Sequence, residues 1–209
     1  MPEAAGGQRG LYSVHPAVRY AQAVGKKMAA RTGRSLEAWA DFVRASGPSS
    51  DAARRAWLAD EHDLHGTTLL MIIDYAAGRR TTIDPDAYLE AAPGFIDSLY
   101  SGEKEPLRPI HDRLIEMVID LGHDIHICPR TMLVPIYRKH LIAEIRPYSH
   151  MRLKLNLALR DAAGRVSRRL SETGGAYRSR ITHCFEIHSM RDVDDEVEDW
   201  LDVAYRIDV

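Results

Sequence analysis

The stretch LKLNLAL, residues 153–159, decides the fold class. Leucine occupies every second position, and Lys154, Asn156 and Ala158 stand between the leucines. Because successive side chains of a β-strand point to opposite faces, this alternation predicts a strand with one buried and one solvated face. The stretch therefore indicates a sheet that packs on one side against the rest of the protein.

Neighbouring stretches predict the other strands. Residues 132–137 alternate in the same way, and residues 141–146 fit an antiparallel return after a turn at Arg138, Lys139 and His140. Further strands are expected at residues 125–128, 165–170 and 181–188, with a mobile turn at residues 173–177. We expect the apolar face of this sheet to consist of Val134, Ile136, Leu153, Leu155, Leu157 and Leu159.

Helices are expected before and after these strands. Apolar stripes at helical spacing predict helices at residues 106–122 and 192–205. The first hundred residues read as helices at 14–31, from Ser35, from Ser50, at 67–77 and from Asp84, the last interrupted at Pro93 and Gly94 and resumed at 95–100. Trp39 and Trp57 are expected in the core of this helical part.

The predicted fold class is α+β, with an N-terminal helical module followed by a short antiparallel β-meander packed against two helices. We expect a flexible leader at residues 1–12, the helical module at 13–101 and the α+β domain at 102–209.

Composition excludes several classes of protein. The 209 residues are 45% hydrophobic and 28% charged, which is typical of a folded globular protein and not of a disordered chain. Two cysteines, Cys128 and Cys184, are too few for a disulfide scaffold. No apolar run is long enough to span a membrane and the first ten residues lack an apolar signal core, so we expect a cytoplasmic protein without a membrane partner.

The net charge of −2 conceals a division along the chain. Residues 130–180 hold twelve Lys and Arg and three Asp and Glu, whereas residues 181–209 hold two and nine. Arginine and lysine bind phosphates and tyrosines stack on bases, so the basic segment suits a nucleic acid. Alternatively, the acidic last helix packs on the basic strands and neutralises them. The candidate ligand-binding residues are Arg138, Lys139, Arg152, Lys154, Arg168, Arg169, Arg178, Arg180 and His183.

Two parts of the chain resemble families of unknown function. A Gly-x-Ser-Leu-x-x-Trp helix start and an Arg-x-x-Trp-Leu helix occur at residues 33–39 and 54–58, before a turn with His62 and Gly66. This segment resembles domain of unknown function 4287, a bacterial family. Residues 107–204 resemble domain of unknown function 5655, through Leu-Gly-x-Asp at 121–124, the LKLNL strand, Thr182-His183 and the closing acidic helix. The two families commonly occur fused in this order, and neither implies an established activity.

Other candidate chemistries have weaker support. His183 beside Arg180 could act as an acid–base group, but no motif ties a nucleophile to it. His126, Cys128, Cys184 and His188 would form a zinc site only if their two strands were neighbours. A turn at His62, Asp63 and His65 could bind an anion or a metal, and it is also explained as a helix–helix turn. The sequence lacks nuclease and nucleotide-binding motifs.

We therefore expect a bacterial, cytoplasmic binding module without catalytic residues, metal or cofactor, and nucleic acid is the first ligand to test. One alternative is a protein that binds a small anionic ligand, or an enzyme, through His183 and the loop with Arg178 and Arg180. A second alternative is an adaptor that binds a protein partner through its acidic helix.

Overall fold

The computed structural model describes residues 10–160, 162, 167–173 and 179–209. The chain divides into two compact units, one formed by Val14–Ala91 and the other by Ala92–Val209 with the short segment before Val14. The division falls within helix α6 (Pro85–Leu99), ten residues before the predicted boundary at 101–102. Of the predicted leader, residues 1–9 lie outside the described part, and Tyr12 is buried and bridges Ile127.

The first unit is helical. Serine side chains cap two of its helices, since Ser35 accepts from the Ala38 N–H and Ser50 from the Ala53 N–H. Trp39 is buried in its core and Trp57 packs against that core, as the sequence predicts. The helices are α1 (Pro16–Lys26), α2 (Met28–Thr32), α3 (Leu36–Ser46), α4 (Asp51–His62) and α5 (Gly66–Ala76), followed by the first part of α6.

Two predicted helices differ from the structure. The single helix expected at residues 14–31 is divided at Lys27 into α1 and α2. The interruption expected at Pro93 is wrong, because α6 continues through this proline. Ala92, Ile96 and Leu99 are buried. Their packing outweighs the hydrogen bond that a proline cannot make.

The second unit contains a six-stranded antiparallel sheet in the order β1-β2-β3-β4-β6-β5. All six residues of the predicted apolar face are buried, which confirms the alternation. The strand expected at 165–170 begins later, at Ser171, although part of that range and residues 174–177 of the predicted turn lie outside the described residues. The strands are β1 (His126–Ile127), β2 (Val134–Tyr137), β3 (Leu141–Ser149), β4 (Arg152–Leu157), β5 (Ser171–Glu172) and β6 (His183–Ile187).

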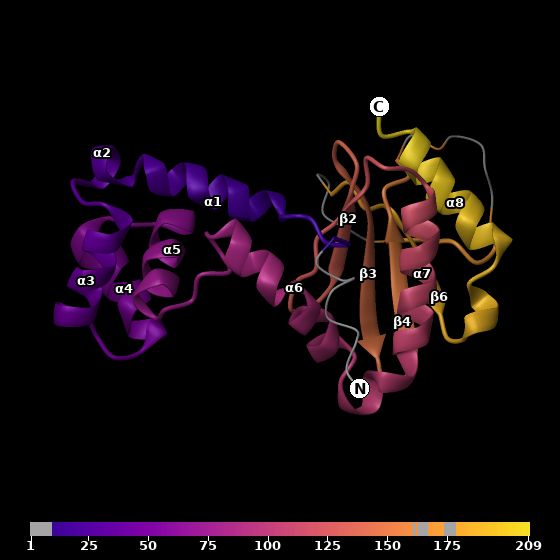
Figure 1. Ribbon diagram of the computed structural model, residues 1–209, viewed down its shortest axis with the longest axis horizontal. Helices are drawn as coiled ribbons and strands as arrows, with labels where there is room; N and C mark the ends of the chain where they lie inside the picture. Colours follow the sequence, from indigo (N-terminus) through magenta and orange to yellow (C-terminus); the bar gives the residue numbers. More distant parts are fainter. Residues whose placement is uncertain (1–9, 161, 163–166, 174–178) are drawn as a thin grey trace. The chain divides into compact units, whose positions relative to one another are not determined.

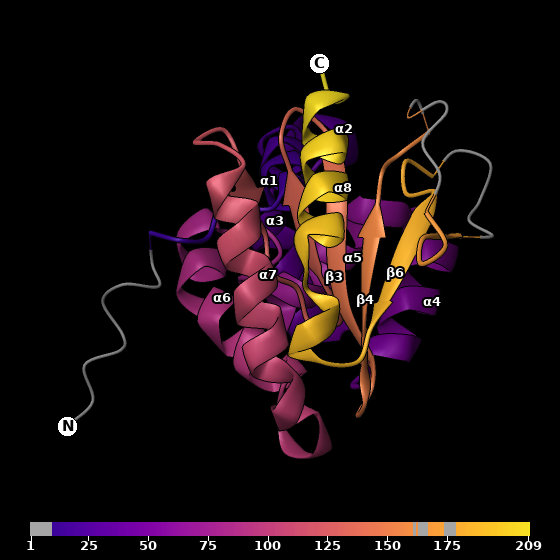
Figure 2. The same cartoon turned by 90° about the vertical axis from the view of Figure 1, so that its right-hand side faces the viewer.

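Two helices cover one face of this sheet. They are α7 (Arg108–Asp120), which follows the short helix η1 (Gly102–Leu107), and α8 (Asp195–Arg206), which follows η2 (Met190–Asp192). Both lie side by side on the same side of the strands (Figures 1 and 2). The fold class is therefore α+β as predicted, with the meander β1–β4 extended by β6 and β5.

A buried polar pair lies beneath α7. His111 is 2% exposed, and its Nδ1 lies 3.0 Å from the buried hydroxyl of Tyr100. Burial, with a smaller contribution from Arg108, lowers the pKa of His111 to about 3. Burial also raises the pKa of Tyr100, so its hydroxyl stays protonated and donates to the unprotonated Nδ1. The folded protein therefore holds His111 neutral.

This pair predicts a loss of stability in mild acid. The unfolded chain takes up a proton on His111 near pH 6.5, whereas the folded chain does so only near pH 3. The contribution of the neutral His111 to the free energy of unfolding is therefore fully present above the pKa of the unfolded chain. About 2 kcal/mol of this contribution is lost on acidification to pH 5. The free energy of unfolding, measured in urea at pH 7.5 and pH 5.0, is expected to fall less between these two pH values in His111→Asn than in the unchanged protein. The exposed His150→Asn serves as the control, and an unchanged pH dependence in His111→Asn would contradict this assignment.

Candidate functional site

Charged side chains gather on the sheet face opposite α7 and α8, here called the polar sheet face. The register aligns Arg146 of β3 with Lys154 of β4, and Lys154 with Glu186 of β6. Since neighbouring strands align in this way, the three side chains form a row across the strands. The charged and polar side chains of this face include Glu144, Arg146, Tyr148, Arg152, Lys154, Asn156 and Glu186.

Tyr148 organises one end of the polar sheet face. A β-bulge between Pro147 and Ser149 leaves Tyr148 without a partner in the strand pairing, and the residue is 52% exposed. The guanidinium of Arg152 lies 4.6 Å from its ring centroid and the ammonium of Lys154 lies 4.3 Å from it. An exposed aromatic ring is thus held beside two cations.

Glu186 pairs with the same two cations. Its carboxylate lies 2.7 Å from Arg152 and 3.5 Å from Lys154. The hydrogen bond from Arg152, followed by the charges of both partners, lowers the pKa of Glu186. The Arg152 and Lys154 side chains remain 30% and 26% exposed, so both cations can still be reached by solvent and by a ligand.

The acidic helix α8 packs on the other side of the sheet. Its apolar residues Val197, Trp200 and Leu201 are buried, whereas Arg146, Arg152 and Lys154 belong to the opposite face. The alternation of β4 requires this separation, because the leucines that face α8 and the cations occupy alternate positions. The sequence allows the alternative that α8 packs on the basic strands and neutralises them. On the polar sheet face this does not occur.

Other candidate cations are paired at the C-terminal end of α8. Arg138 donates to Asp124 at 2.8 Å and to the carbonyls of Tyr205 and Asp208, and it stacks on the Tyr205 ring. The hydroxyl of Tyr205 donates to the same Asp124 at 2.8 Å. These two hydrogen bonds, that of Arg138 first, lower the pKa of Asp124 to about 2. Arg138 thus joins the β2–β3 turn to the segment that follows α7 and to the end of α8.

Arg169 has a comparable role at the N-terminal end of α8. It lies 2.6 Å from Asp194 and 3.1 Å from Glu196, and it donates to the carbonyl of Asp192. Arg180 is paired with Asp208, which it contacts at 2.7 Å. Carboxylates in and beside α8 thus pair with Arg169 and Arg180, whereas Arg138 pairs with Asp124. On the polar sheet face the partner of Arg152 and Lys154 is Glu186.

The remaining predicted site residues are dispersed. Lys139 and Arg168 are exposed, and Arg178 lies outside the described residues. His183 follows the alternation of Phe185 and Ile187 and therefore lies on the α8 side of the sheet. The structure thus separates His183 from Arg152 and Lys154.

His183 lines a small pocket with Trp200, Ser167 and Glu172. Its Nδ1 lies 2.9 Å from the hydroxyl of Thr182, which itself accepts from the Leu159 N–H at 3.1 Å. Thr182 therefore positions the ring. Arg180 lines a different pocket, so these two side chains do not form the joint site that the sequence suggested.

The condition for the zinc site is not met. His126 is in β1 and Cys184 is in β6, and the strands β2, β3 and β4 lie between them. Within the described residues, no group of three or more His, Cys, Asp or Glu side chains is arranged to hold a metal ion. Among the same residues, no helix is both long and apolar enough to span a membrane.

The turn at His62, Asp63 and His65 is explained by helix packing. Asp63 ends α4 in a left-handed conformation, with φ of 52°, and lies 3.0 Å from His65. The His62 ring packs edge-on against Trp57, with centroids 4.7 Å apart, and also contacts Trp39. The turn therefore holds His62 in the aromatic core.

An acidic groove between α7 and α8 was not expected as a unit. The two helices meet along a cavity of about 560 Å³. The groove brings together carboxylates from both helices. Because α7 and α8 lie far apart in the sequence, the sequence did not indicate that these carboxylates share one surface. The groove is lined by Met117, Asp120, Leu121, Asp195, Glu198, Asp199, Asp202 and Arg206. This surface is the one that the adaptor alternative would use, and that alternative stays a prediction.

Comparison with known families covers the second unit. A family model described as Domain of unknown function (DUF5655) matches residues 96–208. The chain belongs to the DUF5655 family. The DUF5655 match includes the whole sheet, α7 and α8, and confirms the resemblance of residues 107–204. Neither a curated protein nor a solved structure matches the chain.

A substitution at Gly122, in the Leu-Gly-x-Asp motif at residues 121–124, tests the packing of Tyr205 against Asp124. A Cβ at Gly122 would overlap the Tyr205 hydroxyl, so Gly122→Ala should displace that ring and break its hydrogen bond with Asp124. We expect a melting temperature several degrees lower. Tyr205→Phe removes the overlapping hydroxyl. In a Tyr205→Phe protein, Gly122→Ala should therefore lower the melting temperature clearly less. If thermal unfolding shows that Gly122→Ala lowers the melting temperature equally with Tyr205 and with Phe at this position, the result would contradict this packing.

Proposed function

We propose that the chain is a non-enzymatic binding module whose DUF5655 domain binds single-stranded nucleic acid on the polar sheet face. The observation that carries the proposal is the packing of α8 on the opposite face, which leaves Arg146, Arg152 and Lys154 on a surface that α8 does not cover. Three cations near an exposed tyrosine offer both kinds of contact that a single strand uses.

The phosphates and the bases would be bound by different side chains. Arg146, Arg152 and Lys154 would contact phosphates, because guanidinium and ammonium groups donate strong hydrogen bonds to phosphate oxygens. Tyr148 would stack on a base, since its ring is exposed and held in place by its neighbours. Stacking and phosphate contacts do not read a defined sequence, so the proposal is of binding with little sequence preference.

The proposal extends to the setting of the protein. We infer that residues 32–73 form a domain of the 4287 family, as their motifs suggest, and that the protein acts in the cytoplasm of a bacterium. Support for a reducing compartment comes from Cys128 and Cys184, which are both buried and are not joined in a disulfide.

Fluorescence anisotropy with a labelled single-stranded oligonucleotide tests the proposal. Binding is expected at low salt and should weaken as the salt concentration rises. The double variant Arg152→Ala/Lys154→Ala should weaken binding and reduce the slope of log Kd against log salt by about 1.4, because each phosphate contact contributes about 0.7. Tyr148→Ala should weaken binding without changing that slope.

A charge-matched control separates this face from the rest of the surface. Arg113→Ala/Arg206→Ala also removes two cations, but from α7 and α8 on the opposite side of the sheet. This variant should bind as the unchanged protein does. Absence of binding at low salt, or equal losses in the two double variants, would overturn the proposal.

A further inference from the structure

The first two helices of the chain carry cations and no acids. Residues 14–36 contain no Asp or Glu, and their Lys and Arg side chains, here called the α1–α2 cations, are Arg19, Lys26, Lys27, Arg31 and Arg34. All five residues are exposed. The first unit as a whole holds ten Lys and Arg and ten Asp and Glu. Its positive charge is therefore concentrated on α1 and α2, although the unit is neutral overall.

The α1–α2 cations are not neutralised by the acids of their own unit. Among the described residues, none of the five forms an ion pair. The arginines of this unit that do pair with an acid are Arg44, Arg54 and Arg79, which belong to α3, α4 and the turn after α5. The charge of α1 and α2 therefore remains available to a ligand.

The periodicity of α1 places Arg19 and Lys26 in the middle of its solvated side. Val18, Ala21 and Val24 are buried and mark the opposite side of the helix. Since seven residues make about two turns, Arg19 and Lys26 lie on one side, about 10 Å apart along the helix axis. Their spacing suits an extended ligand with repeated negative charges.

The other three α1–α2 cations follow along the chain. Lys27 lies at the junction of α1 and α2, and Arg31 lies in the last turn of α2. The guanidinium of Arg34 stacks on Trp39 and Phe42, at 4.9 and 4.1 Å from their ring centroids. This stacking uses the flat side of the guanidinium, so the N–H groups at its edge stay available to an anion.

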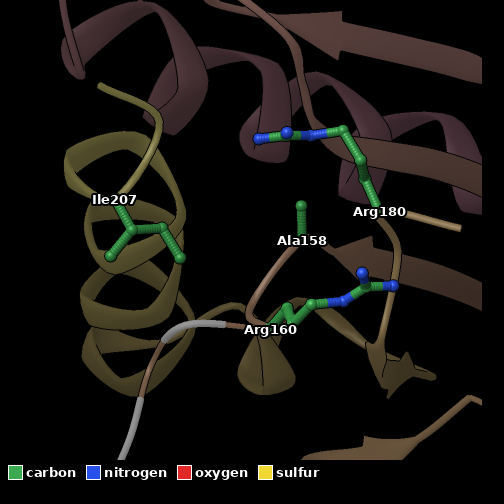
Figure 3. A pocket seen from close by; sticks show the side chains of 4 residues that line it. All are labelled: Ala158, Arg160, Arg180 and Ile207. Atoms are coloured by element: carbon green, nitrogen blue, oxygen red, sulfur yellow. The ribbon is translucent and has the colours of Figure 1, made fainter. Parts of the chain in front are cut away.

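The pocket lined by Arg160 and Arg180 in the second unit is a weaker candidate. Arg180 is already paired with the buried carboxylate of Asp208. In Figure 3 the two guanidinium groups point away from each other on either side of Ala158. The α1–α2 cations have no such anionic partner among the described residues.

We infer that the α1–α2 cations bind the phosphate backbone of the same single-stranded nucleic acid that the polar sheet face binds. The inference rests on the proposed function for the identity of the ligand. A phosphate backbone offers regularly repeated charges, and lysine and arginine bind it without an apolar contact. Because the two units belong to one chain, a strand held by one surface is kept close to the other, which raises the affinity.

Two other partners fit this surface less well. The cores of protein interfaces are rich in apolar side chains and poor in lysine, whereas this surface is built around lysine and arginine. A helix that lies on a membrane inserts its apolar side into the lipid. The apolar side of α1 packs instead in the core of its own unit.

Fluorescence anisotropy with a long labelled oligo(dT) strand tests the inference. Arg19→Ala/Lys26→Ala removes two cations and keeps good helix-forming residues. This variant should raise the Kd at low salt by about tenfold or more and reduce the slope of log Kd against log salt by about 1.4. Arg55→Ala/Arg206→Ala removes two exposed cations from α4 and α8, serves as the charge-matched control and should leave the Kd unchanged.

The same titration separates this inference from the proposed function. Unchanged binding in Arg19→Ala/Lys26→Ala, or a loss no larger than in the control, would overturn the inference. If Arg152→Ala/Lys154→Ala is weakened in that case, the proposed function stands alone. A loss in Arg19→Ala/Lys26→Ala but not in Arg152→Ala/Lys154→Ala would support the α1–α2 site and contradict the polar sheet face.

Two further results would overturn the inference. Absence of oligo(dT) binding by the unchanged protein at low salt would overturn both proposals. Sedimentation with phosphatidylserine and phosphatidylcholine vesicles tests the membrane as a partner. Binding to these vesicles that Arg19→Ala/Lys26→Ala abolishes, with no change in oligo(dT) binding, would assign the α1–α2 cations to a lipid surface.

Discussion

The two-residue period of β4 is the constraint on which the rest of the DUF5655 domain depends. Leu153, Leu155 and Leu157 are fully buried, and their burial requires cover on one face of the sheet. The helices α7 and α8 supply that cover (Figure 2). Because Arg152 and Lys154 alternate with these leucines, the same burial commits both cations to the opposite face. Folding and the distribution of charge thus have one cause.

The ends of α8 are fixed by arginines that lie far away in the sequence. Arg169 binds the acids at the first turn, and Arg138 donates to the carbonyl of Tyr205 in the last turn. The acids of the first turn and the Arg138 guanidinium at the last turn match the helix dipole, which favours acids at the N-terminus and cations at the C-terminus. Asp124 and Asp208 complete the C-terminal cluster. Much of the attraction between the basic segment and the acidic end of the chain therefore serves to position α8.

Local pattern predicts the strands and the core well. The alternation at 153–159 and the apolar stripe of α8 depend on neighbouring residues only, so the sequence alone indicates their buried faces. Pro93 marks the limit of such rules, because the packing of α6 overrides its local preference. Strand pairing likewise decides whether His126 and Cys184 meet, and local pattern does not specify it.

The charged sites could be predicted only in part. The alternation of β4 by itself predicts that Arg152 and Lys154 lie on one face of the strand. The partners of Arg138, Arg169 and Arg180 lie 14 to 70 positions away, so spacing could not show that these cations are neutralised.

The division of the sheet into an apolar face under α8 and a polar face for a ligand is the central claim. Amide chemical shifts of the ¹⁵N-labelled protein, followed during titration with a single-stranded oligonucleotide, test it most directly. The changes are expected to concentrate in β3, β4 and β6 around Arg146, Lys154 and Glu186. Changes concentrated in α7 and α8, or no changes at low salt, would contradict the account.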